Sequence, residues 1–257
     1  MKKIFICNWF LFSVVFLSAQ ENYEIQVYGS ETTPKNETVF ELHSNFTGKG
    51  SLISENGVYF SNKIEHETIE ITHGFGQNFE IGFYLFNAIG SQSRTGFVGT
   101  HIRPRVRVPE NWHWPIGASL SAEIGVQNKL FSEDDFTLEL RPIFDKSIHK
   151  FYFSFNPVLG KAFHGLNSKE SFDFSPNLKA SYELSKKVIG GLEYYGSLGT
   201  LNKFAPRALQ DHCLFFAFDL DVHPKWELNF GYGVALNEKT DGNIIKMILG
   251  YRLFKGK

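Results

Sequence analysis

Cysteine and long apolar runs are both scarce in this chain, and each scarcity excludes a class of protein. Only Cys7 and Cys213 occur among 257 residues, too few for a disulfide-stabilised scaffold. Past residue 20, no apolar run approaches the roughly 20 residues that a membrane-spanning helix needs. A helical membrane protein with several spans is therefore excluded.

Net charge is also nearly absent. The 26 Lys and Arg residues balance 27 Asp and Glu residues, so the formal net charge is −1. A protein that binds nucleic acid by electrostatic attraction is therefore not expected. Aromatic residues, in contrast, are abundant at 16% of the chain, with 27 Phe. The length suits one large domain or two small ones.

The first nineteen residues have the order of a secretory signal peptide. Lys2 and Lys3 are followed by an almost wholly apolar stretch over residues 4–17, and then by the small residues Ser18 and Ala19. We expect cleavage after Ala19, with secretion out of the cytoplasm. The alternative is a buried hydrophobic strand at the N-terminus. Cleavage would leave Cys213 with no intrachain cysteine partner.

From residue 36 onward, apolar residues recur with a period of two, which predicts β-strands. The clearest run places Trp226, Phe230 and Tyr232 on one face and Glu227 and Asn229 on the other. Each run has about 10–13 residues, which matches tilted strands that cross a bilayer. Twelve runs are predicted, over residues 36–47, 64–74, 78–89, 98–108, 116–127, 134–145, 149–160, 171–184, 187–198, 211–222, 225–237 and 243–254.

The connections between these runs alternate in length. They are short after the even-numbered strands and mostly longer and more polar after the odd-numbered ones. Short periplasmic turns and longer extracellular loops are typical of outer-membrane barrels, which also have an even number of strands. The predicted fold class is therefore an all-β, antiparallel transmembrane β-barrel of about twelve strands over residues 36–257. A soluble secreted β-protein remains the alternative fold.

Four prolines fall inside predicted strands, and each removes a hydrogen bond from the ladder. They are Pro104, Pro142, Pro157 and Pro176. Local bulges could accommodate them; otherwise some strands are broken in two and the count of twelve is wrong. Residues 20–35 precede the barrel and form an extra periplasmic strand, an interior plug or a disordered lead.

Charged residues occupy the parity opposite to the apolar one. Over residues 98–108 this parity carries one His and three Arg residues, each of which would cost about 2–4 kcal/mol if it faced hydrocarbon at the midplane. We therefore expect these residues to line a lumen, with Glu80 and Glu123 on the flanking strands as partners. The predicted lumen-lining residues are His101, Arg103, Arg105, Arg107, Glu80, Glu123, Glu139, Arg141, Glu193, Asp219 and Asp221. Further candidates are Glu41, His43, His66, Glu70, Lys179, Glu183, Glu227, Lys246 and Arg252.

Two explanations of the arginine row stay open. The row either neutralises acids and stiffens the wall, or sets the selectivity of a pore for anionic or polar solutes. Aromatic residues near the predicted strand ends are expected at the membrane interface. These are Trp112, Trp114, Trp226, Tyr251 and Phe254.

Catalytic and metal chemistry are not expected. His43 and Ser44 are adjacent in a predicted strand and so point to opposite faces, where the imidazole cannot activate the hydroxyl. The histidines show no HxH or HExxH spacing, so no metal site and no cofactor are predicted.

The segments ELHSNFT (residues 41–47), HETIEITHGF (66–75), HIRPRVRVPENWHWP (101–115) and EYYGSLG (193–199) carry a resemblance. With them the chain resembles an uncharacterised group of bacterial outer-membrane barrels, similar to the transporters named for the MetA pathway of phenol degradation. The resemblance implies a barrel fold and, by association, a transport role.

The expected function is an outer-membrane barrel that forms a narrow channel or transporter for small polar or anionic solutes, and is not an enzyme. Two alternatives remain: a lipid-modifying hydrolase of the outer membrane, and a plugged structural or surface-interaction barrel. The expected partners are outer-membrane lipid, the barrel-insertion machinery and an unknown small solute, without nucleic acid.

Overall fold

A computed structural model describes residues 22–91 and 94–253 of the chain. The predicted signal peptide, Cys7 and the predicted interface residue Phe254 lie outside the described residues. Among those described, no helix is both apolar enough and long enough to cross a membrane. Only two short 3-10 turns occur there, η1 (Glu110–Trp112) and η2 (Arg207–Leu209).

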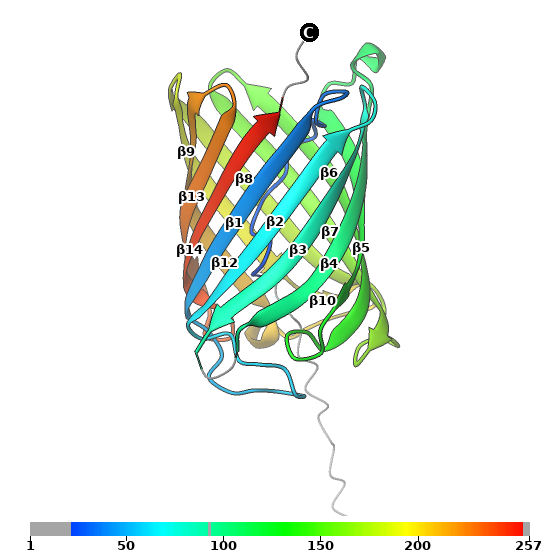
Figure 1. The fold of residues 1–257 in the computed structure, drawn as a ribbon, viewed down its shortest axis with the longest axis vertical. Helices are drawn as coiled ribbons and strands as arrows, with labels where there is room; N and C mark the ends of the chain where they lie inside the picture. Colours follow the sequence, from blue (N-terminus) through cyan, green and yellow to red (C-terminus); the bar gives the residue numbers. More distant parts are fainter. Residues whose placement is uncertain (1–21, 92–93, 254–257) are drawn as a thin grey trace, which may run out of the picture.

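The described chain forms one antiparallel barrel of twelve long strands, which confirms the predicted fold class and strand count (Figure 1). Two further strands of two residues each, β10 (Gly199–Thr200) and β11 (Lys203–Phe204), lie in one long loop. The long strands are β1 (Thr38–Lys49), β2 (Ile64–Gly74), β3 (Phe79–Gly90), β4 (Gly96–Arg107), β5 (Gly117–Gln127), β6 (Asp134–Ile148), β7 (Phe151–Gly165), β8 (Asp173–Ser185), β9 (Val188–Ser197), β12 (Asp211–His223), β13 (Trp226–Ala235) and β14 (Gly242–Leu253).

Consecutive long strands are hydrogen-bonded neighbours, and the sheet closes where β1 pairs with β14. In that seam Thr38 lies opposite Leu253 and Lys49 lies opposite Gly242. Closure leaves every long strand paired on both sides, as a structure that crosses hydrocarbon requires. One rim carries the short turns and the other the long loops; we call them the short-turn end and the long-loop end.

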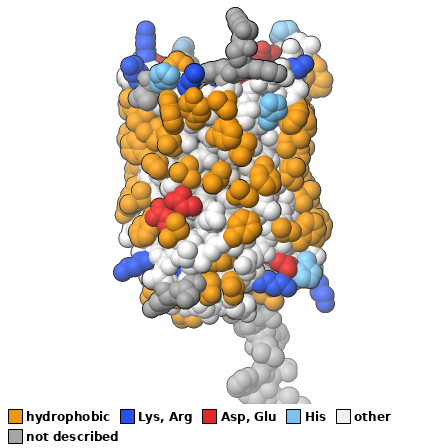
Figure 2. All heavy atoms as spheres, in the orientation of Figure 1, with side chains coloured by type: hydrophobic (Ala, Val, Ile, Leu, Met, Phe, Trp, Pro, Cys, Tyr) orange, Lys and Arg blue, Asp and Glu red, His pale blue; other side chains and the backbone are white. Residues whose placement is uncertain are grey.

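Alternate side chains separate an apolar outer face from a polar interior. On β12, Phe216 is 51% exposed while its neighbour Phe215 is 1% exposed. Trp226 and Phe230 point outward in the same way, whereas Arg103 and Arg105 are buried inside. Figure 2 shows the resulting apolar belt on one face of the barrel, with most charged side chains near both rims and one acidic patch within the belt. This distribution is the one that a membrane barrel needs.

The four in-strand prolines disturb the ladder without breaking any strand. Pro157 and Pro176 face each other across β7 and β8 in an unbroken register. The β4–β5 register skips two positions beside Pro104, and the β6–β7 register skips three around Pro142. Lost hydrogen bonds are therefore absorbed locally, and the count of twelve holds.

Residues 22–35 run through the interior of the barrel as irregular chain, visible in Figure 1 between the strands. The segment begins at the long-loop end, where the side chain of Asn22 donates to Asp241. It leaves at the short-turn end, where Lys35 bridges to Gly74 before β1 starts. Ile25, Val27 and Tyr28 are buried along this path. We call residues 22–35 the interior segment.

The outer belt gives the first prediction. Ile102 lies near the middle of β4 and points outward, so Ile102→Arg should lower the free energy of unfolding in a bilayer by about 2–4 kcal/mol. Leu166→Arg, in the exposed loop after β7, is the control and should change it by less than about 0.5 kcal/mol. Denaturant titration in lipid vesicles measures both; equal effects would mean that the belt does not contact hydrocarbon.

Candidate functional site

The interior holds two cavities, one at each end. The larger, about 950 Å³, opens at the short-turn end and is lined by Arg103, Arg105 and Trp114 together with Gln26 and residues 28–34 of the interior segment. The smaller, about 290 Å³, lies under the long loops and is lined by apolar side chains such as Ile64 and Phe131 and by a similar number of polar ones. The two cavities share no lining residue. Between them the interior is filled by the interior segment and by ionic side chains of the wall.

An arginine-carboxylate network lies where the larger cavity meets this filled waist, and all four of its residues line that cavity. Arg103 on β4 contacts Glu70 on β2 at 2.8 Å and Glu80 on β3 at 3.5 Å, and Arg105 contacts Glu80 at 2.7 Å. Strand pairing brings the four side chains together, because β2, β3 and β4 are neighbours and all four residues have the inward parity. All four are buried, so each charge depends on its partners.

Tyr28 of the interior segment is held among three guanidinium groups of the wall. Its ring lies 4.8 Å from Arg103, 5.5 Å from Arg105 and 4.8 Å from Arg141, measured from each guanidinium carbon to the ring centroid. The phenol donates to the carboxylate of Glu24. Stacking of guanidinium groups on an aromatic face is attractive, so these contacts fix the segment at the waist.

The wall also binds the backbone of the interior segment. Asn156 on β7 pairs with both the N–H and the carbonyl of Tyr28, at 2.8 and 3.0 Å. Arg105 donates to the carbonyls of Gly29 and Glu31, and Lys246 donates to that of Ile25. These contacts satisfy a chain that forms no regular ladder of its own. Apolar contacts add to them, because Ile25 and Val27 pack in one buried cluster with Phe215 of the wall.

A second ionic cluster lies across the barrel on β8, β9, β12 and β14. Glu193 contacts both Lys246 and Lys179, and Lys179 also contacts Asp219 at 2.8 Å. Elsewhere His101 contacts Glu123, and Arg141 contacts Glu139 as well as Glu24 of the interior segment. Positive side chains on the wall are therefore paired with carboxylates at several places around the interior.

Two residues predicted to line the lumen lie near its short-turn end. Arg107 lines the larger cavity there and contacts the exposed Glu110 of η1 at 2.5 Å. Asp221 is exposed near the end of β12, where the register with β13 shifts. The strand ends there, so its parity no longer determines whether it faces the lumen.

The predicted interface aromatics divide into two groups. Trp226 and Tyr251 lie on the outer face in contact with each other, with ring centroids 4.8 Å apart. Trp112 and Trp114 lie in the turn between β4 and β5, and Trp114 lines the mouth of the larger cavity. Trp114 is therefore available to the lumen as well as to the rim.

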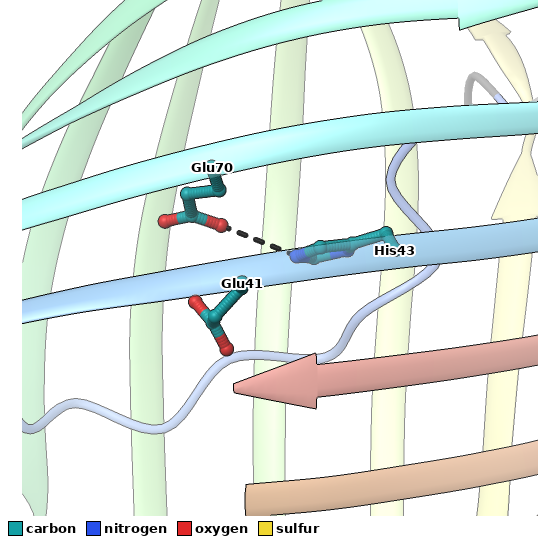
Figure 3. Close-up of side chains that lie close together, drawn as sticks. All are labelled: Glu41, His43 and Glu70. Atoms are coloured by element: carbon teal, nitrogen blue, oxygen red, sulfur yellow. Dashed lines mark ion pairs between the residues drawn. The ribbon is translucent and has the colours of Figure 1, made fainter. Parts of the chain in front are cut away.

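Glu41, His43 and Glu70 form a compact group on adjacent strands (Figure 3). One ligand-type atom from each lies within 4.8 Å of the others. His43 Nε2 lies 3.4 Å from Glu70 Oε2, while Ser44, the next residue along β1, donates to Glu67 Oε2 on the opposite face. The histidine and the serine therefore cannot act together.

Sequence reasoning did not find the contacts of the interior segment. Its short alternation of Tyr23, Ile25 and Val27 was visible, but the contacts of Tyr28 with Arg103 and Asn156 join residues 75 and 128 positions apart in the chain. Two ion pairs likewise join residues that are far apart in the chain. Glu193 on β9 contacts Lys246 on β14, and Glu24 of the interior segment contacts Arg141 on β6. Parity can place such residues inside, but it cannot pair them across a lumen.

The buried network predicts unequal effects for two arginines of the same strand. Arg103→Met leaves Glu70 without its guanidinium partner and should lower the free energy of unfolding by about 3–5 kcal/mol. Arg107→Met removes only a contact with an exposed carboxylate and should cost about 0–1 kcal/mol. Chemical unfolding of the two folded barrels tests this; a similar loss in both would contradict the network.

Comparison with known proteins supports the fold. No family model matches the chain, and no curated protein matches it. Among solved structures, the chain is similar to the KdgM porin, with a TM-score of 0.51 and 10% identity over 85% of this chain and 99% of that one. It also has similarity to outer membrane phospholipase A from Escherichia coli, with a TM-score of 0.45 and 10% identity over 91% of this chain and 95% of that one. At such identities the likeness concerns the fold, which is that of outer-membrane β-barrels. The resemblance to the MetA-pathway transporters stays a prediction.

Proposed function

We propose that this protein is a gated channel of the outer membrane for small polar or anionic solutes, and that the interior segment is its gate. Under this proposal the short-turn end faces the periplasm, the belt contacts lipid, and the barrel-insertion machinery places the protein in the membrane. Transport, rather than hydrolysis, is the role of the lumen.

The attachment of the interior segment carries the proposal. The wall holds the segment at many points through hydrogen bonds from charged side chains, and these side chains keep a second partner on the wall. Water can replace hydrogen bonds of this kind when the segment moves, at a modest net free-energy change for each. Displacement also exposes Ile25 and Val27, which pack against Phe215, and this apolar cost favours the closed state.

The same contacts support the proposed preference for small anionic solutes. Displacement of the segment removes the Glu24 carboxylate from Arg141, and the carbonyls of Gly29 and Glu31 from Arg105. Three guanidinium groups also lose the ring of Tyr28. The emptied waist would therefore present cationic groups that have lost partners, and such groups favour anions.

A reversible lock tests the gate. Ser30 Oγ of the interior segment donates to Asp145 Oδ1 of β6 at 2.7 Å, so cysteines at these two positions are close enough to attempt a disulfide. In planar bilayers, the oxidised Ser30→Cys, Asp145→Cys protein should lose its large openings, and a reductant should restore them.

The single variant Ser30→Cys is the control, since it cannot form this bridge and Cys213 is buried. Its conductance should not respond to oxidation. If a fully bridged double variant conducts like the reduced protein, the segment does not gate the pore.

Selectivity gives an independent prediction. In a KCl gradient of about tenfold, the wild-type reversal potential should have the sign of anion preference, and Arg105→Gln should move it toward zero because it removes a charge at the waist. Lys203→Gln removes a charge from an exposed loop and should leave the potential unchanged. Cation preference in the wild-type protein, unaltered in Arg105→Gln, would exclude an anion channel.

A further inference from the structure

The group of Glu41, His43 and Glu70 has the composition and placement of a divalent metal site. His43 is 0% exposed and Glu70 is 1% exposed. Glu41 lies two residues before His43 on the same inward face of β1 (Figure 3). One imidazole and two carboxylates are a donor set that suits Zn²⁺ and related transition ions. Mg²⁺ and Ca²⁺ prefer sites made of oxygen ligands alone.

The spacing of the ligand atoms supports this assignment. Ligand atoms bound at about 2.0–2.1 Å in a tetrahedral zinc site lie about 3.4 Å apart. His43 Nε2 and Glu70 Oε2 are 3.4 Å apart, and the Glu41 oxygen lies within 4.8 Å of both. A rotation of the Glu41 side chain would complete the triad, and the larger cavity that Glu41 lines leaves room for it.

The surroundings of Glu70 orient it for such a role. Its Oε1 accepts hydrogen bonds from Thr72 Oγ1 at 2.6 Å and from Arg103 at 2.8 Å. Its Oε2 has no hydrogen-bond donor and faces His43. Fixing one carboxylate oxygen and leaving the other free is the usual arrangement of groups that position a metal ligand.

Neither histidine nitrogen is satisfied by a hydrogen bond. His43 Nδ1 and Nε2 are both buried without one, and Nε2 is directed at the Glu70 carboxylate. Glu41 forms no salt bridge among the described residues, although it lies beside two other carboxylates, Glu70 and Glu227. A buried imidazole without a hydrogen bond and a carboxylate that lies beside two others are both costly unless a cation completes the group.

We propose that Glu41, His43 and Glu70 bind one Zn²⁺-class ion, which reaches them from the cavity at the short-turn end. Glu41 and Glu70 both line that cavity, so the ion has a path that does not cross the filled waist. Three protein ligands leave at least one coordination position for water. Because Arg103 contacts both Glu70 and Tyr28, the ion would sit next to the anchor of the interior segment.

Calorimetric titration of the folded, detergent-solubilised barrel with Zn²⁺ alone tests the site. We expect one ion per barrel with a Kd below about 10 µM. Glu41→Gln and His43→Gln should each weaken binding by at least about tenfold, as loss of a ligand or its support does. Glu31→Gln is the matched control, because Glu31 is an exposed carboxylate lining the same cavity and should leave the Kd unchanged.

A heat-modifiable gel shift verifies that each variant is folded. If His43→Gln does not fold, Glu41→Gln carries the test alone, since its side chain faces the cavity and makes no salt bridge there. Absence of stoichiometric Zn²⁺ binding to the wild-type barrel would overturn the proposal. So would a Kd that Glu41→Gln weakens no more than Glu31→Gln does, or tight binding of Ca²⁺ in preference to Zn²⁺.

Discussion

The structure depends on mutual neutralisation of buried charges inside a closed sheet. Strand alternation assigns every second side chain to the interior, and much of this set is ionic, so arginines and carboxylates must meet there. Arg103 and Arg105 share Glu80, while Lys246 and Lys179 share Glu193. Because Glu80 and Glu193 each serve two cations, removal of either carboxylate disturbs more than one partner, and the interior contains shared clusters rather than independent pairs only.

The interior segment belongs to this network. Glu24 contributes a carboxylate to Arg141, and Tyr28 contributes a ring to three guanidinium groups. The barrel wall alone would leave these cations with fewer partners. The segment thus both fills the space and adjusts the charge balance of the lumen, which is why a gate and a selectivity element can be the same fourteen or so residues of chain.

Periodicity in the sequence was enough to predict the barrel. The outward positions of Phe216, Trp226 and Phe230 and the inward positions of Arg103 and Arg105 follow from a period of two and from the high cost of charge in hydrocarbon. Parity and strand order also placed Glu80 beside the arginine row, because β3 and β4 are consecutive strands and Glu80 lies opposite Arg105. The path of residues 22–35 could not be predicted, because an irregular chain has no period. The grouping of Glu41 and His43 with Glu70 was also hidden, since its third member lies on the next strand and no local motif links the three.

The lengthwise course of the interior segment has a topological consequence. Asn22 lies at the long-loop end, whereas β1 begins at the short-turn end and closes the barrel against β14. The polypeptide therefore doubles back inside its own cylinder before the first strand is laid down. Two orders of assembly are compatible with this path. Either β14 pairs with β1 after the interior segment is already inside, or the segment enters the barrel after it has closed. Closure of the barrel and insertion of the interior segment are therefore coupled steps of folding.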